Sequence, residues 1–263
     1  MNRRIDVLLQ YRRLILDLAV TDLKARYASS FLGLFWACVQ PVVTVAIYAL
    51  VFGAGFRMQP QDGYPYVPWL VAGMIPWICF QDTVLMSAVC LKEYSYLVKK
   101  VVFDVKLLPV TKAVTALMIH MVFLALCILV HRICRIPATL LYLQLPWYLL
   151  CNMHLALGTA FLVSALNVFF PDLQQIVSIL LQFGIWMTPV MWHETLFGPA
   201  VEKYVRLNPM YYVVSGYRDS MCGGPGFWEK PVLTLWFWLI TLALLFTGIQ
   251  VFRRLERHFA DVL

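Results

Sequence analysis

The run LLPVTKAVTALMIHMVFLALCILV, residues 107–130, decides the fold class because most of its side chains are apolar. A helix needs about 20 consecutive, mostly apolar residues to cross the hydrocarbon core of a bilayer. The run lacks the two-residue alternation of apolar and polar side chains that a membrane β-strand would show. It therefore predicts a membrane-spanning α-helix.

Five further runs meet the same criterion, and they cover residues 31–56, 68–91, 140–170, 173–191 and 232–252. Of the 263 residues, 62% are hydrophobic and only 13% are charged, whereas a soluble domain usually has about 25% charged residues. We therefore predict an all-α integral membrane protein with six transmembrane helices, folded as a single transmembrane domain over residues 1–263.

The basic residues that flank these runs predict the orientation. If the N-terminus lies inside, thirteen Lys and Arg residues flank the inner ends of the spans and seven flank the outer ends. Because inner loops carry the excess of Lys and Arg, both termini are expected in the cytoplasm. Residues 1–26 lack the unbroken apolar core of a cleaved signal peptide, so we expect none.

Two segments outside the spans are expected to be helical. Residues 1–30 predict an amphipathic helix on the inner membrane surface, or one packed on a partner protein, because apolar side chains recur on one helical stripe. Those side chains are Leu9, Leu16, Val20, Leu23 and Tyr27. Residues 193–230 are too polar to span and too apolar for a free loop. They predict short re-entrant helices that protein or a water-filled cavity must shield.

The chain shows no sequence pattern of an enzyme. No phosphate-binding G-x-x-x-x-G-K-[ST] occurs, and neither do H-E-x-x-H, G-x-S-x-G or a carboxylate cluster at metal-ligand spacing. We therefore expect no catalytic residue, no metal site and no cofactor. The charged or titratable residues within the spans are Asp82, Lys112, His120 and His154. A proton relay among them is the alternative that a secondary transporter would require.

Several motifs, in order along the chain, resemble the permease subunit of bacterial polysaccharide ABC exporters, which export O-antigen, capsule or teichoic acid. They are RYASSFLGLFWACVQP at 26–41, LVKKVVF at 97–103, DLQQIV at 172–177, TPVM at 188–191, LNPMYY at 207–212, YRD at 217–219 and RRLERHFADVL at 253–263. The sequence departs from the family pattern at Asp104, where a proline is usual, and at Pro171, where an arginine is usual.

The resemblance implies a homodimer in the bacterial inner membrane, with two nucleotide-binding ATPase subunits that hold ATP and Mg²⁺. It would export a lipid-linked, O-antigen-like polysaccharide and would not bind nucleic acid. A drug or lipid cargo, or proton-coupled secondary transport, is the alternative function. Residues 92–106 would form the cytoplasmic coupling segment; their basic and apolar residues also suit anionic lipid.

The resemblance and the residue patterns together give three sets of candidate site residues. The aromatic set is expected to line the channel because aromatic faces stack on sugars, although Trp and Tyr also gather at membrane interfaces generally. This set is Tyr48, Phe52, Phe56, Phe183, Trp186, Tyr211 and Tyr212. The coupling set is Tyr94, Leu97, Lys99, Lys100 and Phe103, and the set on the N-terminal helix at the cytoplasmic gate is Leu16, Leu23, Arg26 and Tyr27.

Overall fold

The structure, a computed structural model, describes residues 2–27, 33–55, 63–99 and 103–263. The side chains of residues 2–10, 27, 34, 37, 38, 40, 41 and 54 lie outside that description. The described residues are almost entirely helical, with no β-strand among them. The prediction of an all-α chain is therefore confirmed for this part of the sequence.

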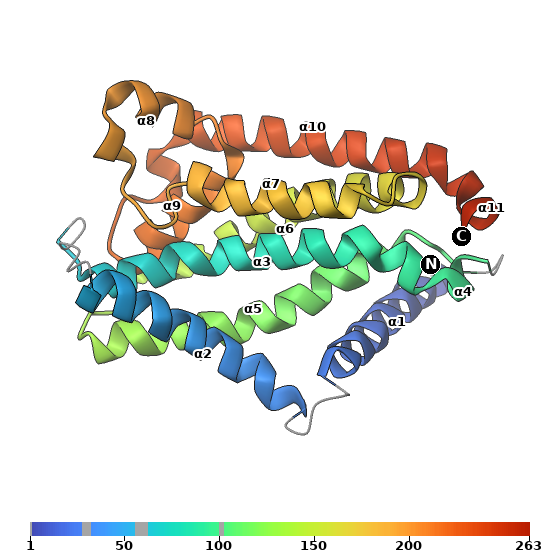
Figure 1. Cartoon of the computed structure of the whole chain (residues 1–263), viewed down its shortest axis with the longest axis horizontal. Helices are drawn as coiled ribbons and strands as arrows, with labels where there is room; N and C mark the ends of the chain where they lie inside the picture. The colour runs from blue at the N-terminus through green and yellow to red at the C-terminus, as the bar shows by residue number, and fades with distance from the viewer. Residues whose placement is uncertain (1, 28–32, 56–62, 100–102) are drawn as a thin grey trace.

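Four helices are long and apolar enough to cross a membrane. They are α3 (Tyr66–Glu93), α5 (Leu107–Ile133), α6 (Leu145–Phe169), which follows the 3₁₀ turn η3 (Leu140–Gln144), and α10 (Pro231–Leu255). These helices run side by side as a bundle, with α6 packed against both α3 and α10 (Figure 1). The chain is a multi-pass membrane protein.

The other two predicted spans contain shorter helices. The first is α2 (Trp36–Tyr48), which follows the 3₁₀ turn η1 (Gly33–Phe35) and continues as the π-helix η2 (Ala49–Gly55). The second, α7 (Leu173–Met187), has 15 residues. It is therefore about 22 Å long, which is less than the roughly 30 Å of a bilayer core.

The predicted end of the fifth span at residue 191 is wrong. Helix α7 ends at Met187, and Thr188 is extended with ψ 133°. A residue that precedes proline avoids the helical region for steric reasons, and Thr188 precedes Pro189. The chain thus leaves the helix while still in the buried interior, because Thr188 and Val190 are both 0% exposed.

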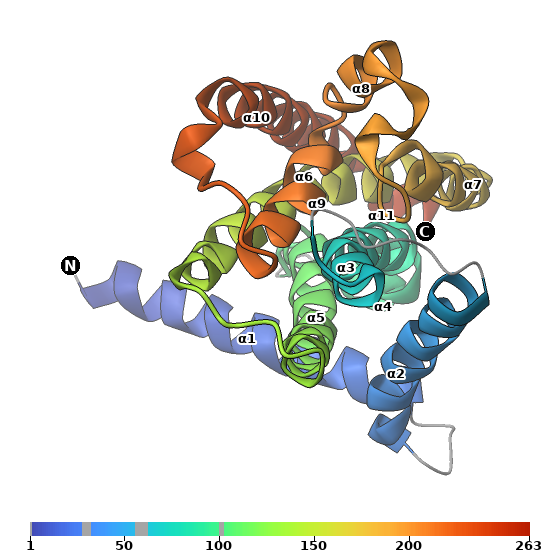
Figure 2. The same cartoon turned by 90° about the vertical axis from the view of Figure 1, so that its left-hand side faces the viewer.

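The two ends of the bundle differ. Helix α1 (Asn2–Tyr27) crosses the bundle next to α5 (Figure 2). The short helices α4 (Ser95–Val98), η6 (Glu256–His258) and α11 (Phe259–Val262) lie at the end of the bundle where both chain termini are found (Figure 1). We call this the terminal end. The opposite end, the α8–α9 end, carries η4 (Glu194–Phe197), α8 (Pro199–Val205), α9 (Pro209–Met221) and η5 (Phe227–Glu229) (Figure 1).

Two glycines let α6 and α10 approach closely. A Cβ atom on Gly248 would lie 2.4 Å from the carbonyl oxygen of Gly158, and one on Gly158 would lie 2.9 Å from the backbone nitrogen of Leu245. Helices in membranes commonly associate through such small residues, because lipid supplies little hydrophobic drive for helix association. The contact of α6 with α10 therefore depends on these two positions.

We expect Gly248→Val to destabilise the folded protein by about 1–3 kcal/mol, since the added methyl groups would force the two backbones apart. Thermal unfolding of the purified protein in detergent measures the change. Ala243→Val, on an exposed position of the same helix, is the matched control and should leave the midpoint nearly unchanged. Equal midpoints for both variants would contradict the packing described.

Candidate functional site

One side of α7 is apolar and exposed. Phe183 is 66% exposed and Trp186 is 58% exposed. Ile176, Leu180 and Met187 are exposed at intervals of three to four residues along the same helix, so these five side chains form a row that we call the channel face. The structure thus places two of the predicted aromatic channel residues together on one uncovered surface.

The predicted aromatic stripe on α2 turns inward instead. Tyr48 and Phe52 are half-buried. Their rings stack with centroids 5.9 Å apart, and the Phe52 ring lies 6.0 Å from that of Tyr66 on α3. These aromatic rings fill the contact of the first span with α3. Apart from Trp36 at the start of α2, the large residues that α2 and η2 expose are aliphatic, with Ile47 and Leu50 at 55% and 68%, and Phe56 lies outside the described residues.

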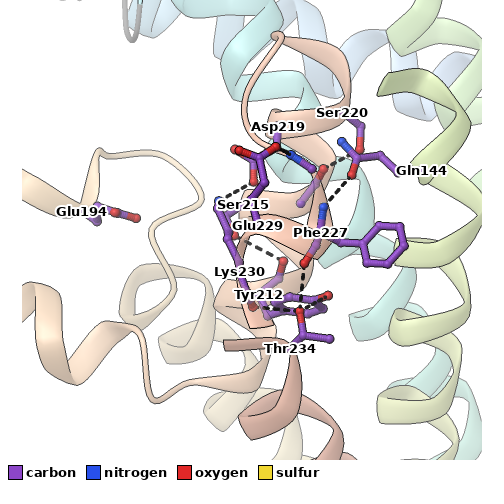
Figure 3. Close-up of polar contacts among 12 residues, drawn as sticks. Gln144, Glu194, Tyr212, Ser215, Asp219, Ser220, Phe227, Glu229, Lys230 and Thr234 are labelled. Atoms are coloured by element: carbon purple, nitrogen blue, oxygen red, sulfur yellow. Dashed lines mark hydrogen bonds and ion pairs between the residues drawn. The ribbon is translucent and has the colours of Figure 1, made fainter. Parts of the chain in front are cut away.

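Tyr211 and Tyr212 are buried, at 4% and 1% exposure. The Tyr212 hydroxyl accepts a hydrogen bond from Trp147 Nε1 at 3.1 Å and lies 3.0 Å from the hydroxyl of Thr234 (Figure 3). Its ring stacks on Phe237 with centroids 4.8 Å apart. These contacts of Tyr212 join α9 to α6 and α10. Because both tyrosines are buried and neither lies on the uncovered surface of α7, we leave both out of the proposed channel lining.

Arg218 on α9 donates hydrogen bonds to backbone carbonyl groups of the extended segment that follows α7. Its guanidinium donates to the carbonyl oxygens of Pro189 at 2.7 Å and Val190 at 2.6 Å, and to that of Trp69 at 3.3 Å. It also lies 3.4 Å from the centroid of the Trp69 ring, where a cation–π attraction adds to the contact. Non-helical backbone at membrane depth needs such partners, and Arg218 explains why the early end of α7 is tolerated.

The coupling segment has an inner and an outer side. Tyr94, Leu97 and Phe103 are half-buried and pack on a hydrophobic cluster at the terminal end. Lys99 is exposed, and so is Tyr96 at 57%. Only Lys99 of the described coupling residues is therefore fully available to a partner, and Tyr96 joins it as a residue that sequence reasoning left out of the set. Lys100 lies outside the described residues.

Asp104 closes the turn that leads into α5. Its carboxylate accepts a hydrogen bond from the backbone nitrogen of Lys106 at 3.2 Å, and the Lys106 ammonium lies 3.1 Å from a carboxylate oxygen of Glu256. A short acidic side chain that caps its own turn in this way can define the local backbone without a proline. The hydrogen bond of the Asp104 carboxylate thus holds this turn at the position where the family usually has a proline.

Lys112 joins three segments at the terminal end. Its ammonium nitrogen lies 2.8 Å from Asp22 Oδ2 on α1 and 2.7 Å from Glu93 Oε2 at the end of α3. The Tyr94 hydroxyl donates a hydrogen bond to the other oxygen of Asp22. Burial and this hydrogen bond raise the pKa of Tyr94, so the hydroxyl remains a donor. We call Asp22, Glu93, Tyr94 and Lys112 the Lys112 cluster.

The Lys112 cluster was not predicted, although one signal for it was present. A lysine inside an apolar span needs an acidic partner, and only 7% of the Lys112 side chain is exposed. Its partners lie 90 and 19 residues away in the sequence, so spacing alone could not select them. A cavity of about 500 Å³ lies beside the cluster and is also lined by Arg26.

Helix α1 docks through a face next to the predicted stripe. Ala19 is fully buried, and its carbonyl oxygen accepts a hydrogen bond from the Thr115 hydroxyl at 3.4 Å. Leu23 is half-buried, whereas Leu16 is 40% exposed. Arg26 is exposed and lies 3.8 Å from Asp82 of α3. The Tyr27 side chain lies outside the described part.

The titratable residues of the spans do not meet in one chain of contacts. Asp82 faces Arg26, and Lys112 faces its two acids. His120 Nε2 lies 3.0 Å from the Tyr217 hydroxyl, and His154 Nδ1 lies 2.8 Å from the carbonyl oxygen of Leu150. Each group is occupied locally, so the described geometry gives no support to a proton relay.

The sequence pattern of the ABC-2 type transporter family matches residues 14–222. The chain belongs to this family. The matched range includes α7, the coupling segment and most of α1. It therefore covers the channel face and all four residues of the Lys112 cluster.

Three relatives extend the comparison beyond the family pattern. The chain is 29% identical to the O-antigen export system permease protein RfbA of Myxococcus xanthus over 99% of both chains. It is 24% identical to the RfbA protein of Klebsiella pneumoniae over 92% of both chains. It is also 24% identical to the polysialic acid transport protein KpsM of Escherichia coli, over 91% of this chain and 92% of that protein.

We expect Lys112→Met to loosen α1, because the change leaves the carboxylates of Asp22 and Glu93 without their cation and so costs about 3 kcal/mol. Hydrogen exchange at the amides of residues 12–26 should become faster. Lys24→Met, which removes an exposed ammonium from α1 itself, is the control and should leave exchange unchanged. Unaltered exchange in Lys112→Met would show that the cluster does not hold the helix.

Proposed function

We propose that this chain is the channel-forming permease subunit of an ATP-driven exporter that moves a lipid-linked, O-antigen-like polysaccharide across the bacterial inner membrane. Family membership and the full-length similarity to O-antigen and polysialic acid permeases support the cargo class. The structural observation that carries the proposal is the channel face of α7, where Phe183 and Trp186 are uncovered.

In this proposal the chain crosses the membrane six times. Helices α2 and α7, with their 3₁₀, π or extended continuations, add two spans to the four long ones. The terminal end faces the cytoplasm, as the distribution of Lys and Arg favours. Helix α1 then lies at the inner membrane surface, since it is crosswise to the bundle (Figure 2). Its exposed Leu16 and Val20 would face lipid.

Two copies would enclose the channel between them. The apolar rows of α7 and α2 are uncovered in the single chain, and uncovered apolar surfaces mark interaction sites or lipid contacts. The aliphatic residues of α2 suit the contact between copies, whereas the rings of Phe183 and Trp186 suit a passing sugar chain. Aromatic faces attract the polarised C–H groups of sugars without holding any one unit deeply.

Energy would come from two nucleotide-binding ATPase subunits that hold ATP and Mg²⁺ at the terminal end. Lys99 and Tyr96 present an exposed cation and ring to such a partner. Tyr94 lies on the inner side of the same segment, and its hydroxyl donates a hydrogen bond to the carboxylate of Asp22 on α1. A displacement of the coupling segment would therefore reach α1 through the Lys112 cluster and open or close the cytoplasmic entrance.

We expect Trp186→Leu to lower the amount of surface polysaccharide by up to about tenfold, because a stacking platform is lost while the apolar surface is kept. Immunoblots or chemical assays of whole cells measure the polysaccharide. Phe246→Leu on α10 is the control, since Phe246 is 65% exposed on a different helix. The same loss in both variants, or in neither, would remove the channel face from the proposal.

We expect Lys99→Glu to weaken binding of the ATPase subunit by about tenfold. A glutamate at this position would repel the acidic surface that we expect the ATPase subunit to present to Lys99. Co-purification and the rate of permease-stimulated ATP hydrolysis report the change. Arg132→Glu reverses an exposed arginine at the opposite end of α5, outside the cavities of the α8–α9 end, and should leave both readouts intact. Normal binding and hydrolysis in Lys99→Glu would contradict the coupling assignment.

A further inference from the structure

Two adjoining cavities lie at the α8–α9 end. Their volumes are about 550 Å³ and 640 Å³, and both are lined by Glu194, Tyr211 and Lys230. Figure 3 shows Glu194 on one side, pointing toward the Asp219–Lys230 pair on the other. Each cavity falls within the 300–1,000 Å³ typical of small-molecule sites. We call the two together the outer cleft.

The charged groups of the outer cleft are held in fixed pairs. Lys230 Nζ lies 2.5 Å from Asp219 Oδ2, and Arg206 lies 3.0 Å from Glu194 and 2.6 Å from Glu202. The Glu229 carboxylate accepts a hydrogen bond from the backbone nitrogen of Gly226 at 2.8 Å. Preorganised polar groups of this kind bind a ligand without first losing much side-chain freedom.

The pairs also offset most of the charge of the cleft. The basic lining residues are Lys203, Arg206, Arg218 and Lys230, and the acidic ones are Glu194, Asp219 and Glu229. A cleft lined by four basic and three acidic groups, with Arg206 also paired to Glu202 outside the lining, keeps little net charge with which to attract a phosphate or a polyanion. It does offer carboxylate acceptors and ammonium donors to hydroxyl groups, which can both donate and accept.

Aromatic side chains supply the apolar part of the cleft. Trp236 is 39% exposed, and its indole nitrogen donates to the carbonyl oxygen of Leu207 at 3.1 Å, which fixes the ring. In the other cavity His193 stacks on Trp69 with ring centroids 6.1 Å apart, beside Tyr64. Flat rings next to paired hydrogen-bonding groups match the two faces of a sugar, one of C–H groups and one of hydroxyls.

We propose that the outer cleft binds a short stretch of uncharged sugar units. That these sugar units belong to the exported polysaccharide rests on the proposed function. The cleft lies at the end of the bundle opposite the ATPase subunits. It would therefore hold the emerging glycan between rounds of ATP hydrolysis and oppose its return into the channel. Trp236 and the Glu194 carboxylate are the groups that contact the sugar.

The test compares two glutamates that share one arginine. Both Glu194 and Glu202 pair with Arg206, but only Glu194 lines the cavities. Binding is measured by calorimetry on the full chain in nanodiscs. The probes are the neutral oligosaccharides released by mild acid from the surface polysaccharide of the cells that make this chain, and oligosialic acid of matched length. Glu194→Gln should weaken binding of the neutral oligosaccharides by about tenfold, and Glu202→Gln by less than about twofold.

A second pair of variants tests the cleft independently, in case Glu194→Gln does not fold. Trp236→Leu should weaken binding by about tenfold, whereas Trp228→Leu, which changes an exposed tryptophan outside the cleft, should leave it unchanged. Absence of binding by the unaltered chain, equal loss within either pair of variants, or tighter binding of oligosialic acid would overturn the proposal. Normal polysaccharide export together with any of these results would overturn the cleft alone and leave the proposed function standing.

Discussion

The ion pairs of Lys112 organise the terminal end of this protein. An ammonium group inside an apolar span is tolerated only with counter-charges close by, and here the carboxylates come from α1 and from the end of α3. One side chain therefore fixes the crosswise helix to the bundle, and the Tyr94 hydroxyl ties the coupling segment to the same carboxylate. The two elements expected to receive force and to gate the entrance are thus one connected structure. This is the physical basis for placing an ATPase partner at that end.

The α8–α9 end is built on a different constraint, the need to satisfy backbone groups away from water. Arg218 supplies donors to the carbonyl groups of Pro189 and Val190, so α7 can stop short. The segments that follow α7 fold back as α8 and α9, which supply residues to the outer cleft. The extended segment after α7 therefore connects the helix that carries the channel face to the elements of the outer cleft.

Apolar runs predicted the four long helices to within five residues at each end, because a continuous stretch such as 107–130 has few alternatives to a membrane helix. The end of α7 was missed, since the effect of Pro189 on the residue before it outweighed the apolar pattern. The inward direction of Tyr48 and Phe52 was also missed, because a stripe of aromatic residues is equally suited to a pore and to packing on α3. The partners of Lys112 lie on separate segments, and only the folded chain brings them together.

The central claim is that this chain is the conduit of an exporter that another protein drives. Reconstitution into proteoliposomes tests it most directly, with the purified chain alone, with the nucleotide-binding subunit added, and with that subunit plus ATP and Mg²⁺. The account predicts translocation of the lipid-linked polysaccharide only in the last case, at a rate that follows ATP hydrolysis. Full translocation by this chain alone, or none when both subunits and ATP are present, would contradict it.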